Sequence, residues 1–581
     1  MRDRVWRFLG VLVTSVLVLT ACAPTLPIDG EVGSAEVSER EAPDYGPDPQ
    51  PPQPGASPED IIEGFIDAGA GAADDHAVAR EYLTEEFAGQ WDPRNQTLVY
   101  SEGNISIDAA GEYVYNVQLN VDARVDGSGS IIRSNDPTSE TFEVEEVDGE
   151  WRISNAPDAK ILDEVAFDMV YSEFTLYFYD PQRRYAVPDV RWLPNLPSQS
   201  TELVNRVLTG PVPWLAPGVI SAFGEPEEEN GGVGASSVTV NENVATVELD
   251  SSLTAGVSDD ELALMHHQLS MALHQLSAVH RVELTVGGDP LDVPESEQIA
   301  QIQSDPSALE RQIGVQGDQL IWQLSTDTST VPGMPDLSGI QPRFPAVSTE
   351  AEGEVVAVMS GDLDALYHVR TDASEPELLV ESETMTRPSM DNFGWTWTVT
   401  HDEDGEPTIR AFNYEDPEEG SVAVTADFIA GREVTSLRIS QDGTRAALVV
   451  DDAGVRNLYI APVQREGSAG APWSLGQHHR LHPDDAVEIG EVRWSNNDEV
   501  FVWRPQDSDD EVEPRYMQRI NVSGSAEPPY EAVTGVLNVS VGEGRDSVYL
   551  EQQDYGILQF VGDSPHQQEI DDDVRDLSYS G

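Results

Sequence analysis

The chain has 581 residues, enough for three or four domains, and its 39% hydrophobic and 7% aromatic residues can form packed cores, so global disorder is not expected. Its 32 lysines and arginines stand against 106 aspartates and glutamates, a formal net charge of −74. Such a surface repels phosphate backbones, so nucleic acid is not expected as a partner. Solubility, for example in salty surroundings, is the simplest reason for the charge.

The first 22 residues have the pattern of a bacterial export signal. A basic stretch is followed by an apolar run over residues 8–19, which is too short to span a bilayer. The run ends in Leu19-Thr20-Ala21-Cys22, which resembles the lipobox of bacterial lipoproteins, and Cys22 is the only cysteine. We therefore expect residues 1–21 to be a signal peptide, cleaved between Ala21 and Cys22. An uncleaved signal anchor is the alternative.

The lipobox resemblance implies a lipid anchor on Cys22, with a diacylglyceryl group on the sulfur and a fatty acyl group on the new N-terminus. Such a lipidation site would hold the protein on the extracytoplasmic face of the cell membrane. Residues 22–57 are rich in proline, glycine and acidic residues. This composition predicts a disordered tether.

Residues 58–160 are predicted to form an α+β domain. Ser57 can cap a helix that has Pro58 at its first position, and alternating strands follow, with a hairpin turn at Asp148-Gly149. Helices followed by a curved antiparallel sheet resemble the nuclear-transport-factor-2-like fold. Asp67, His76 and Trp91 could line a pocket there, although ordinary packing or surface roles are the more common explanation.

Residues 165–295 are predicted to form a second α+β domain. A strand ends at Tyr177-Phe178, the turn Leu208-Thr209-Gly210-Pro211 follows a short helix, and Asp259 is expected to cap a longer helix that leads to a closing strand at residues 282–286. This succession resembles the GerMN domain of spore-germination and cell-envelope proteins.

Residues 315–570 carry an internal repeat in which a strand ends at a serine and a turn follows. The repeated serines are Ser348, Ser389, Ser440, Ser495 and Ser540. Strand, turn and strand at this spacing predict a β-propeller of five or six blades. A sixth blade would combine residues 320–322 with strands near the C-terminus, and a β-sandwich is the alternative.

No motif for catalysis or metal binding stands out. His266, His267 and His274 share a predicted helix without a metal-binding pattern, and the glycines at 231, 232 and 234 lack dinucleotide-binding spacing. Residues 402–405 and 507–513 only partly match a calcium loop. The only lysine, Lys160, has Pro157 three residues before it, which rules out a Ser-x-x-Lys motif. We expect no catalytic residue, no metal site and no cofactor.

The lipobox, the nuclear-transport-factor-2-like unit, the GerMN unit and the propeller, in this order, resemble the LpqB family of actinobacterial lipoproteins. The resemblance implies a non-enzymatic accessory of a two-component system that contacts the extracytoplasmic part of a sensor histidine kinase (MtrB) and acts in cell-envelope homeostasis and division. Only Cys22 carries over residue by residue.

Two other functions stay open. A protein that binds a small envelope ligand, such as a glycan fragment, would have a deep apolar pocket with a few convergent polar groups. A propeller hydrolase would have an acidic cluster at its central channel.

Overall fold

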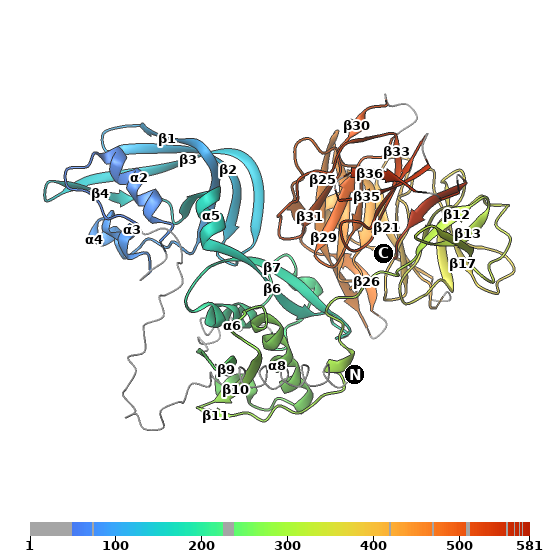
Figure 1. The fold of residues 1–581 in the computed structure, drawn as a ribbon, viewed down its shortest axis with the longest axis horizontal. Coiled ribbons are helices and arrows are strands. Elements are labelled where there is room, and N and C mark those ends of the chain that lie inside the picture. The colour runs from blue at the N-terminus through green and yellow to red at the C-terminus, as the bar shows by residue number, and fades with distance from the viewer. Residues whose placement is uncertain are drawn as a thin grey trace, which may run out of the picture. The chain divides into compact units, whose positions relative to one another are not determined.

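The structure is a computed structural model that describes residues 49–71, 75–224, 237–416, 420–467, 470–506, 512–553, 556–562, 564–568, 570–571 and 573–581. The expected signal peptide, its cleavage site between Ala21 and Cys22, the lipidation site at Cys22, and most of the expected tether lie outside the described residues. Among the helices that are described, none has both the length and the apolar character needed to cross a membrane. The fold class is confirmed: two α+β domains precede a β-propeller (Figure 1).

The N-terminal domain places its short helices before a five-stranded sheet of order β4-β3-β2-β1-β5, in which only the β1–β5 pair is parallel. Its elements are α2 (Pro58–Ala68), α3 (Ala77–Glu81), α4 (Glu85–Ala88), β1 (Gln96–Ala109), β2 (Val114–Asp126), β3 (Ile131–Val147), β4 (Glu150–Asn155), β5 (Lys160–Asp163) and α5 (Glu164–Val170).

Helix α2 begins where the sequence predicts. The Ser57 side chain accepts a hydrogen bond from the Asp60 backbone N–H, and the Asp60 carboxylate accepts one from the Ser57 N–H, which completes a capping box. The apolar side chains of α2 pack on the sheet, and Figure 1 shows the helix lying over the strands. The Asp148-Gly149 turn joins β3 to β4 with a positive φ at both residues, as a two-residue hairpin requires.

The prediction of a disordered tether is wrong for its last residues, 49–57. The Tyr82 hydroxyl donates to the carbonyl oxygen of Gln50 at 2.8 Å, and the Gly55 N–H donates to the Glu150 carboxylate at 2.8 Å. Residues 49–57 therefore lie against the N-terminal domain. Proline-rich composition keeps a chain extended, but an extended chain can still dock on a folded surface.

The opposite face of the N-terminal sheet is covered by α5 and by the long hairpin that follows it. Phe167 and Val170 of α5 pack with Val99 and Leu162 of the sheet, and Trp192 of the hairpin packs against the same cluster. Residues 165–170 therefore belong with the first domain, so the expected start of the second domain at 165 is too early.

The middle domain joins two helices to a hairpin and a four-stranded sheet of order β11-β10-β9-β8. Its elements are β6 (Tyr171–Tyr179), β7 (Ala186–Pro194), α6 (Gln199–Thr209), the 3-10 turn η1 (Ala216–Gly218), β8 (Val238–Asn241), β9 (Val244–Glu248), α7 (Ser251–Thr254), α8 (Asp259–Leu273), β10 (Arg281–Val286), β11 (Asp289–Pro290) and the 3-10 turn η3 (Ile299–Gln301).

Helix α8 is capped one residue earlier than expected. The Ser258 side chain accepts from the Glu261 N–H, and Asp259 is the first helical residue. Leu264, Leu269 and Leu273 of α8 are buried, and Leu269 and Leu273 pack with β9 and β10, which run parallel to each other. A serine can cap and an aspartate can follow it in the first turn, because both residue types favour a helix N-terminus.

Within the described residues, the propeller has six sheets of three or more strands. The first sheet contains β12 (Gln312–Gln316), β13 (Gln319–Leu324), β14 (Asp327–Thr330) and β37 (Val574–Ser578), and the second contains β15 (Arg343–Ala346), β16 (Val355–Met359), β17 (Ala365–Arg370) and β18 (Glu377–Glu381). The third contains β19 (Ser389–Met390), β20 (Trp395–His401), β21 (Pro407–Asn413) and β22 (Ser421–Val424), and the fourth contains β23 (Glu433–Ile439), β24 (Arg445–Asp452), β25 (Val455–Glu466), β26 (Ala471–Leu475) and β27 (His479–Leu481). The fifth contains β28 (Glu491–Trp494), β29 (Glu499–Trp503) and β31 (Gln518–Asn521), and the sixth contains β33 (Val536–Val541), β34 (Val548–Gln552), β35 (Gly556–Val561) and β36 (Ser564–Gln567). A small pair of strands, β30 (Pro514–Arg515) and β32 (Val533–Thr534), accompanies the fifth sheet.

The first sheet closes the ring with strands that are far apart in the sequence. β12 pairs with β37, so the expected sixth blade, built from residues 320–322 and a strand near the C-terminus, is confirmed. The expected domain end at 570 is wrong because it leaves β37 out. Figure 1 shows the red C-terminal end of the chain beside the yellow β12.

Candidate functional site

A cavity of about 310 Å³ lies where the open edge of the N-terminal sheet meets the start of the middle domain. Its walls combine cations, carboxylates, aromatic rings and aliphatic groups: Asp75, His76, Arg94, Thr97, Val125, Asp126, Gly127, Gly129, Lys160, Tyr171, Trp192, Leu193, Pro194, Leu196, Ser198, Glu202 and Arg206. This volume is at the lower end of the range for small-molecule pockets.

Lys160 reaches this cavity because of its place in β5. The parallel register sets Lys160 beside Thr97 of β1, and the alternation of β5 sends Lys160 and Leu162 to one face of the sheet and Ile161 to the other. Only 6% of Lys160 is exposed. The single lysine of a strongly acidic chain is therefore buried in a pocket wall.

The Lys160 ammonium lies 4.8 Å from the centre of the Tyr171 ring. The Tyr171 hydroxyl and the Thr97 hydroxyl share a hydrogen bond of 2.8 Å, which fixes the ring. Within the described part of the chain, no hydrogen bond and no ion pair is found for the Lys160 ammonium. A cation–π contact is its main compensation for lost hydration.

His76 is the second buried polar group of the wall, with 7% of the residue exposed. Its Nδ1 has no hydrogen-bond partner. Burial, followed by the nearby Lys160 charge, lowers the pKa of His76 to about 4, so the ring is neutral at pH 7. Asp75 and His76 both have left-handed backbone, with φ of 56° and 58°. Such strain in two consecutive non-glycine residues is held by its surroundings and is common at binding sites.

The carboxylates of the wall already have partners. Asp75 pairs with Arg80 at 2.8 Å and with Arg94 at 3.0 Å, and Glu202 pairs with Arg206 at 2.7 Å along α6. One Asp126 oxygen accepts from the backbone N–H groups of Ser128 and Ser130. None of these carboxylates is the counter-ion of Lys160.

The loop between β2 and β3 fastens the cavity to the middle domain. The backbone N–H of Trp192 donates to the Gly129 carbonyl at 2.8 Å. The buried Arg191 guanidinium donates to the Ser128 carbonyl and pairs with Asp189 at 2.6 Å. Gly129 has a φ of 89°, and a Cβ there would come within 2.9 Å of Leu193. Only glycine fits, so the wall position of Trp192 and Leu193 depends on it.

Of the three pocket candidates in the N-terminal domain, the structure places only His76 in this cavity. Trp91 belongs to the core, where its indole N–H donates to the Pro157 carbonyl. Asp67 lines a separate groove with Tyr100 and Asp163, where burial, Glu63 and Asp163 raise the pKa of Asp67.

The histidines of α8 do not converge. His266 contacts the Val282 carbonyl, the Nδ1 of His267 contacts the Tyr179 hydroxyl at 2.9 Å, and His274 is exposed at the end of the helix. Across the described ranges, no group of three or more potential metal-ligating side chains is found. In the 402–405 turn, the Asp402 carboxylate accepts from the Asp404 and Glu406 N–H groups. The glycines at 231, 232 and 234 and residues 507–511 lie outside the described residues.

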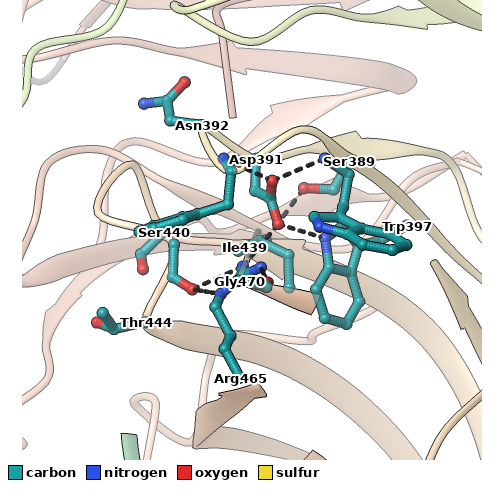
Figure 2. Close-up of polar contacts among 12 residues, drawn as sticks. Ser389, Asp391, Asn392, Trp397, Ile439, Ser440, Thr444, Arg465 and Gly470 are labelled. Carbon is teal, nitrogen blue, oxygen red and sulfur yellow. Dashed lines mark hydrogen bonds and ion pairs between the residues drawn. The ribbon is translucent and has the colours of Figure 1, made fainter. Parts of the chain in front are cut away.

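The repeated serines of the propeller lie within or just after the first strand of each of five sheets, and all are buried. Figure 2 shows the network around two of them. The Asp391 carboxylate, two residues after Ser389, accepts from the N–H groups of Phe393 and Trp395 and from the Trp397 indole at 2.7 Å. The Arg465 guanidinium pairs with it at 2.6 Å.

The neighbouring sheet repeats this arrangement. The Ser440 hydroxyl donates to the Asp442 carboxylate at 2.6 Å, and Arg445 pairs with the same carboxylate. The Ser389 hydroxyl accepts from the Ile439 N–H, which joins the two sheets (Figure 2). These residues form the internal framework of the propeller, since every carboxylate in the network is buried and paired.

Near the inner strands of the propeller, the acidic side chains of Glu491 and Asp576 lie beside arginines. Among the described residues, Arg438 of β23 and Arg387 before β19 lie within ion-pair distance of Glu491, and Arg343 of β15 pairs with Asp576 at 2.6 Å. Burial and the nearby Asp576 raise the pKa of Glu551 to about 7.

The middle domain packs on the propeller through aromatic contacts. The Trp214 ring stacks on His479 at 5.5 Å, and the rings of Tyr185 and Phe393 meet edge to face at 5.7 Å. The Arg184 guanidinium donates to the Asn392 carbonyl at 3.0 Å.

This order of domains defines a class of three-domain proteins with a GerMN-like middle domain and a C-terminal propeller. Three family models match in the same order: "Lipoprotein LpqB, N-terminal domain" over residues 51–168, "Sporulation and spore germination" over 175–292 and "Lipoprotein LpqB beta-propeller domain" over 318–572. The chain belongs to the LpqB family of lipoproteins, as its sequence suggested. Membership implies a membrane-anchored lipoprotein.

Individual relatives cover most of the chain. A Lipoprotein LpqB of Nocardia farcinica is 28% identical over 505 residues, which is 79% of this chain and 79% of the relative. One of Streptomyces avermitilis is 26% identical and covers 93% of both chains. The solved first GerMN domain of the sporulation protein GerM from Bacillus subtilis is 17% identical and covers 21% of this chain and 89% of its own, with a TM-score of 0.18.

Proposed function

We propose that this protein is anchored by lipid on Cys22 at the extracytoplasmic face of the cell membrane and acts, without catalysis of its own, as a modulator of a sensor histidine kinase of the MtrB type. The observation that carries the proposal is the match of the first and last domains to LpqB family models, with a match to a spore-germination family model between them. The lipobox-like sequence Leu19-Thr20-Ala21-Cys22 supports the anchor.

The propeller supports action by contact. Its buried acid–arginine pairs are parts of the framework, and the propeller packs on the middle domain through Trp214 and His479. A lipid anchor confines the protein to the same thin layer as the outer domain of a membrane kinase, so a weak contact can still be occupied.

Modulation by contact makes a quantitative demand. The protein must bind one signalling state of the kinase more tightly than the other, by about 5–150-fold for a typical coupling. The kinase is reconstituted in liposomes, and autophosphorylation is measured with the lipidated protein, with a soluble form from Ala23 to Gly581, and with neither. A change with the lipidated form and a smaller change with the soluble form are expected. No binding and no change with either form would contradict the proposal.

The anchor has its own test. Cys22→Ser removes the sulfur that would receive the diacylglyceryl group, so labelled palmitate should enter the parent chain and not the variant. Equal labelling of both would show that the anchor is elsewhere.

The pocket around Lys160 favours a second function, the binding of a small envelope ligand. Its convergent polar groups are those expected of a binding site and not of a packing defect.

A further inference from the structure

We propose that the cavity around Lys160 binds a small organic anion through one carboxylate or phosphate group, with Lys160 as the counter-ion and His76 as a hydrogen-bond donor. This inference goes beyond contact with a kinase and holds whether or not that contact occurs.

The first step is the charge of Lys160. A buried ammonium without a counter-ion loses its hydration and regains little of it, and natural proteins keep such groups paired. The other buried cations near this cavity follow that rule, since Arg191 has Asp189 at 2.6 Å and two backbone carbonyls. Lys160 has the Tyr171 ring alone in the described structure, so an anion completes its surroundings.

The second step concerns the sign of the ligand's charge. A cationic ligand would need a carboxylate to spare, but Asp75, Asp126 and Glu202 are engaged by arginines or backbone N–H groups. His76 has an unpartnered Nδ1 that can donate to an oxygen in the tautomer with the proton there. An ammonium and an imidazole donor together suit a carboxylate or a phosphate.

The third step is the size and lining of the cavity. A volume of about 310 Å³ is too large for an inorganic ion alone. Beside the polar groups, the walls carry Trp192, Leu193 and Val125, which offer apolar surface to a carbon skeleton. The ligand is therefore a small anion with an organic body.

The fourth step concerns how the site is held. Lys160 sits on a strand in fixed register with Thr97, Tyr171 is fixed by its hydroxyl contact with Thr97, and His76 is held in a strained backbone conformation. A site whose groups are already in place binds without a large ordering cost.

The test uses the mature lipidated chain in nonionic detergent and three probes of similar shape: phenyl phosphate, benzoate and neutral benzyl alcohol. Binding is measured by isothermal titration calorimetry at constant ionic strength, because salt screens the repulsion between an anion and this acidic surface. We expect one site per chain for phenyl phosphate, benzoate or both, and none for benzyl alcohol. The preferred anion identifies the head group.

Lys160→Met gives an unbranched side chain that is one atom shorter and removes the charge. We expect it to weaken anion binding by about tenfold to a hundredfold, the effect of losing one charged hydrogen bond. The matched control is Arg281→Met, which removes an exposed cation of β10 and should leave affinity unchanged. His76→Phe should weaken binding by about threefold to tenfold, since it removes a neutral donor.

Two results would overturn the proposal. One is anion binding of equal strength in the parent protein and Lys160→Met, which would place the anion elsewhere. The other is the absence of binding by both anions to a parent protein whose thermal unfolding is cooperative.

Discussion

The propeller turns and the Lys160 pocket bury charge in opposite ways. In the turns, the Asp391 and Arg465 side chains are almost completely buried and meet at 2.6 Å, with every remaining carboxylate lone pair directed at a backbone or indole N–H. In the pocket, Lys160 is equally hidden but faces an aromatic ring and a cavity. A buried charge that is fully paired stabilises one arrangement of the chain, whereas a buried charge without a partner indicates a site where a ligand of opposite charge could bind.

The largest expected effect concerns the paired region. Asp391→Ala leaves the Arg465 guanidinium buried without its counter-ion, so the propeller should lose about 3–5 kcal/mol of stability. Differential scanning calorimetry of the whole chain would measure this loss. Asp402→Ala is the control, because its carboxylate also accepts two backbone N–H groups but lies in an exposed turn. Equal losses in the two variants would show that burial of the charge pair does not matter.

His479 extends the comparison between paired and unpaired buried charges, because it is a buried titratable group that stays neutral at pH 7. Burial, the neighbouring His482 and His478 outweigh Asp126 and lower the pKa of His479 to about 4. The unfolded chain, with an ordinary histidine pKa of about 6.5, binds more protons between pH 6.5 and 4, so this residue's contribution to stability falls as pH falls through that window.

Between pH 7 and pH 5, this contribution falls by about 2 kcal/mol. His479→Gln should therefore show a smaller loss of stability over the same pH range than the parent protein, as measured by urea unfolding at the two pH values. His274→Gln, at an exposed position, is the control and should keep the parent's pH dependence. The same pH dependence in His479→Gln as in the parent would mean that His479 is hydrated in solution.

The smallest expected effect is a gain in stability. Without a ligand, Lys160→Met removes a buried ammonium that has no ion pair among the described residues and keeps most of the packing, so stability should rise by about 1 kcal/mol, less what the contact with Tyr171 contributes. The matched variant is Arg191→Met, which removes a paired cation and should destabilise the protein because Asp189 is left buried. Thermal unfolding of both variants shows whether the stability of each rises or falls. A loss in Lys160→Met would mean that the lysine has a structural partner.

The sequence predicts the propeller better than the pocket, and the reason is physical. The serine repeat is a local pattern, because the strand, the serine and the turn that follows are consecutive, and so the five sheets can be recognised one at a time. The sixth follows from the need of a propeller to close. The pocket is built from β1, β5, the β2–β3 loop, β7 and α6, which only the folded chain brings together.

One signal for the pocket was present in the sequence. A single lysine at the start of the strand Lys160-Ile161-Leu162 in so acidic a chain is unusual, and its burial could have been suspected from its apolar neighbours. The domain limits at 57, 165 and 570 were also wrong for a non-local reason. Residues 49–57, α5 and β37 each pack on a part of the fold that composition does not reveal.

The pairing of β12 with β37 also sets the order of events when the chain folds. Contacts between segments so far apart form slowly, and chains emerge and fold from the N-terminus. Before β37 arrives, β12 has an open edge that bears Ile313 and Val315, both buried in the finished ring. Unpaired apolar edges of this kind attract other strands. The newly made protein is therefore most exposed to aggregation and to proteases in the interval before its ring closes.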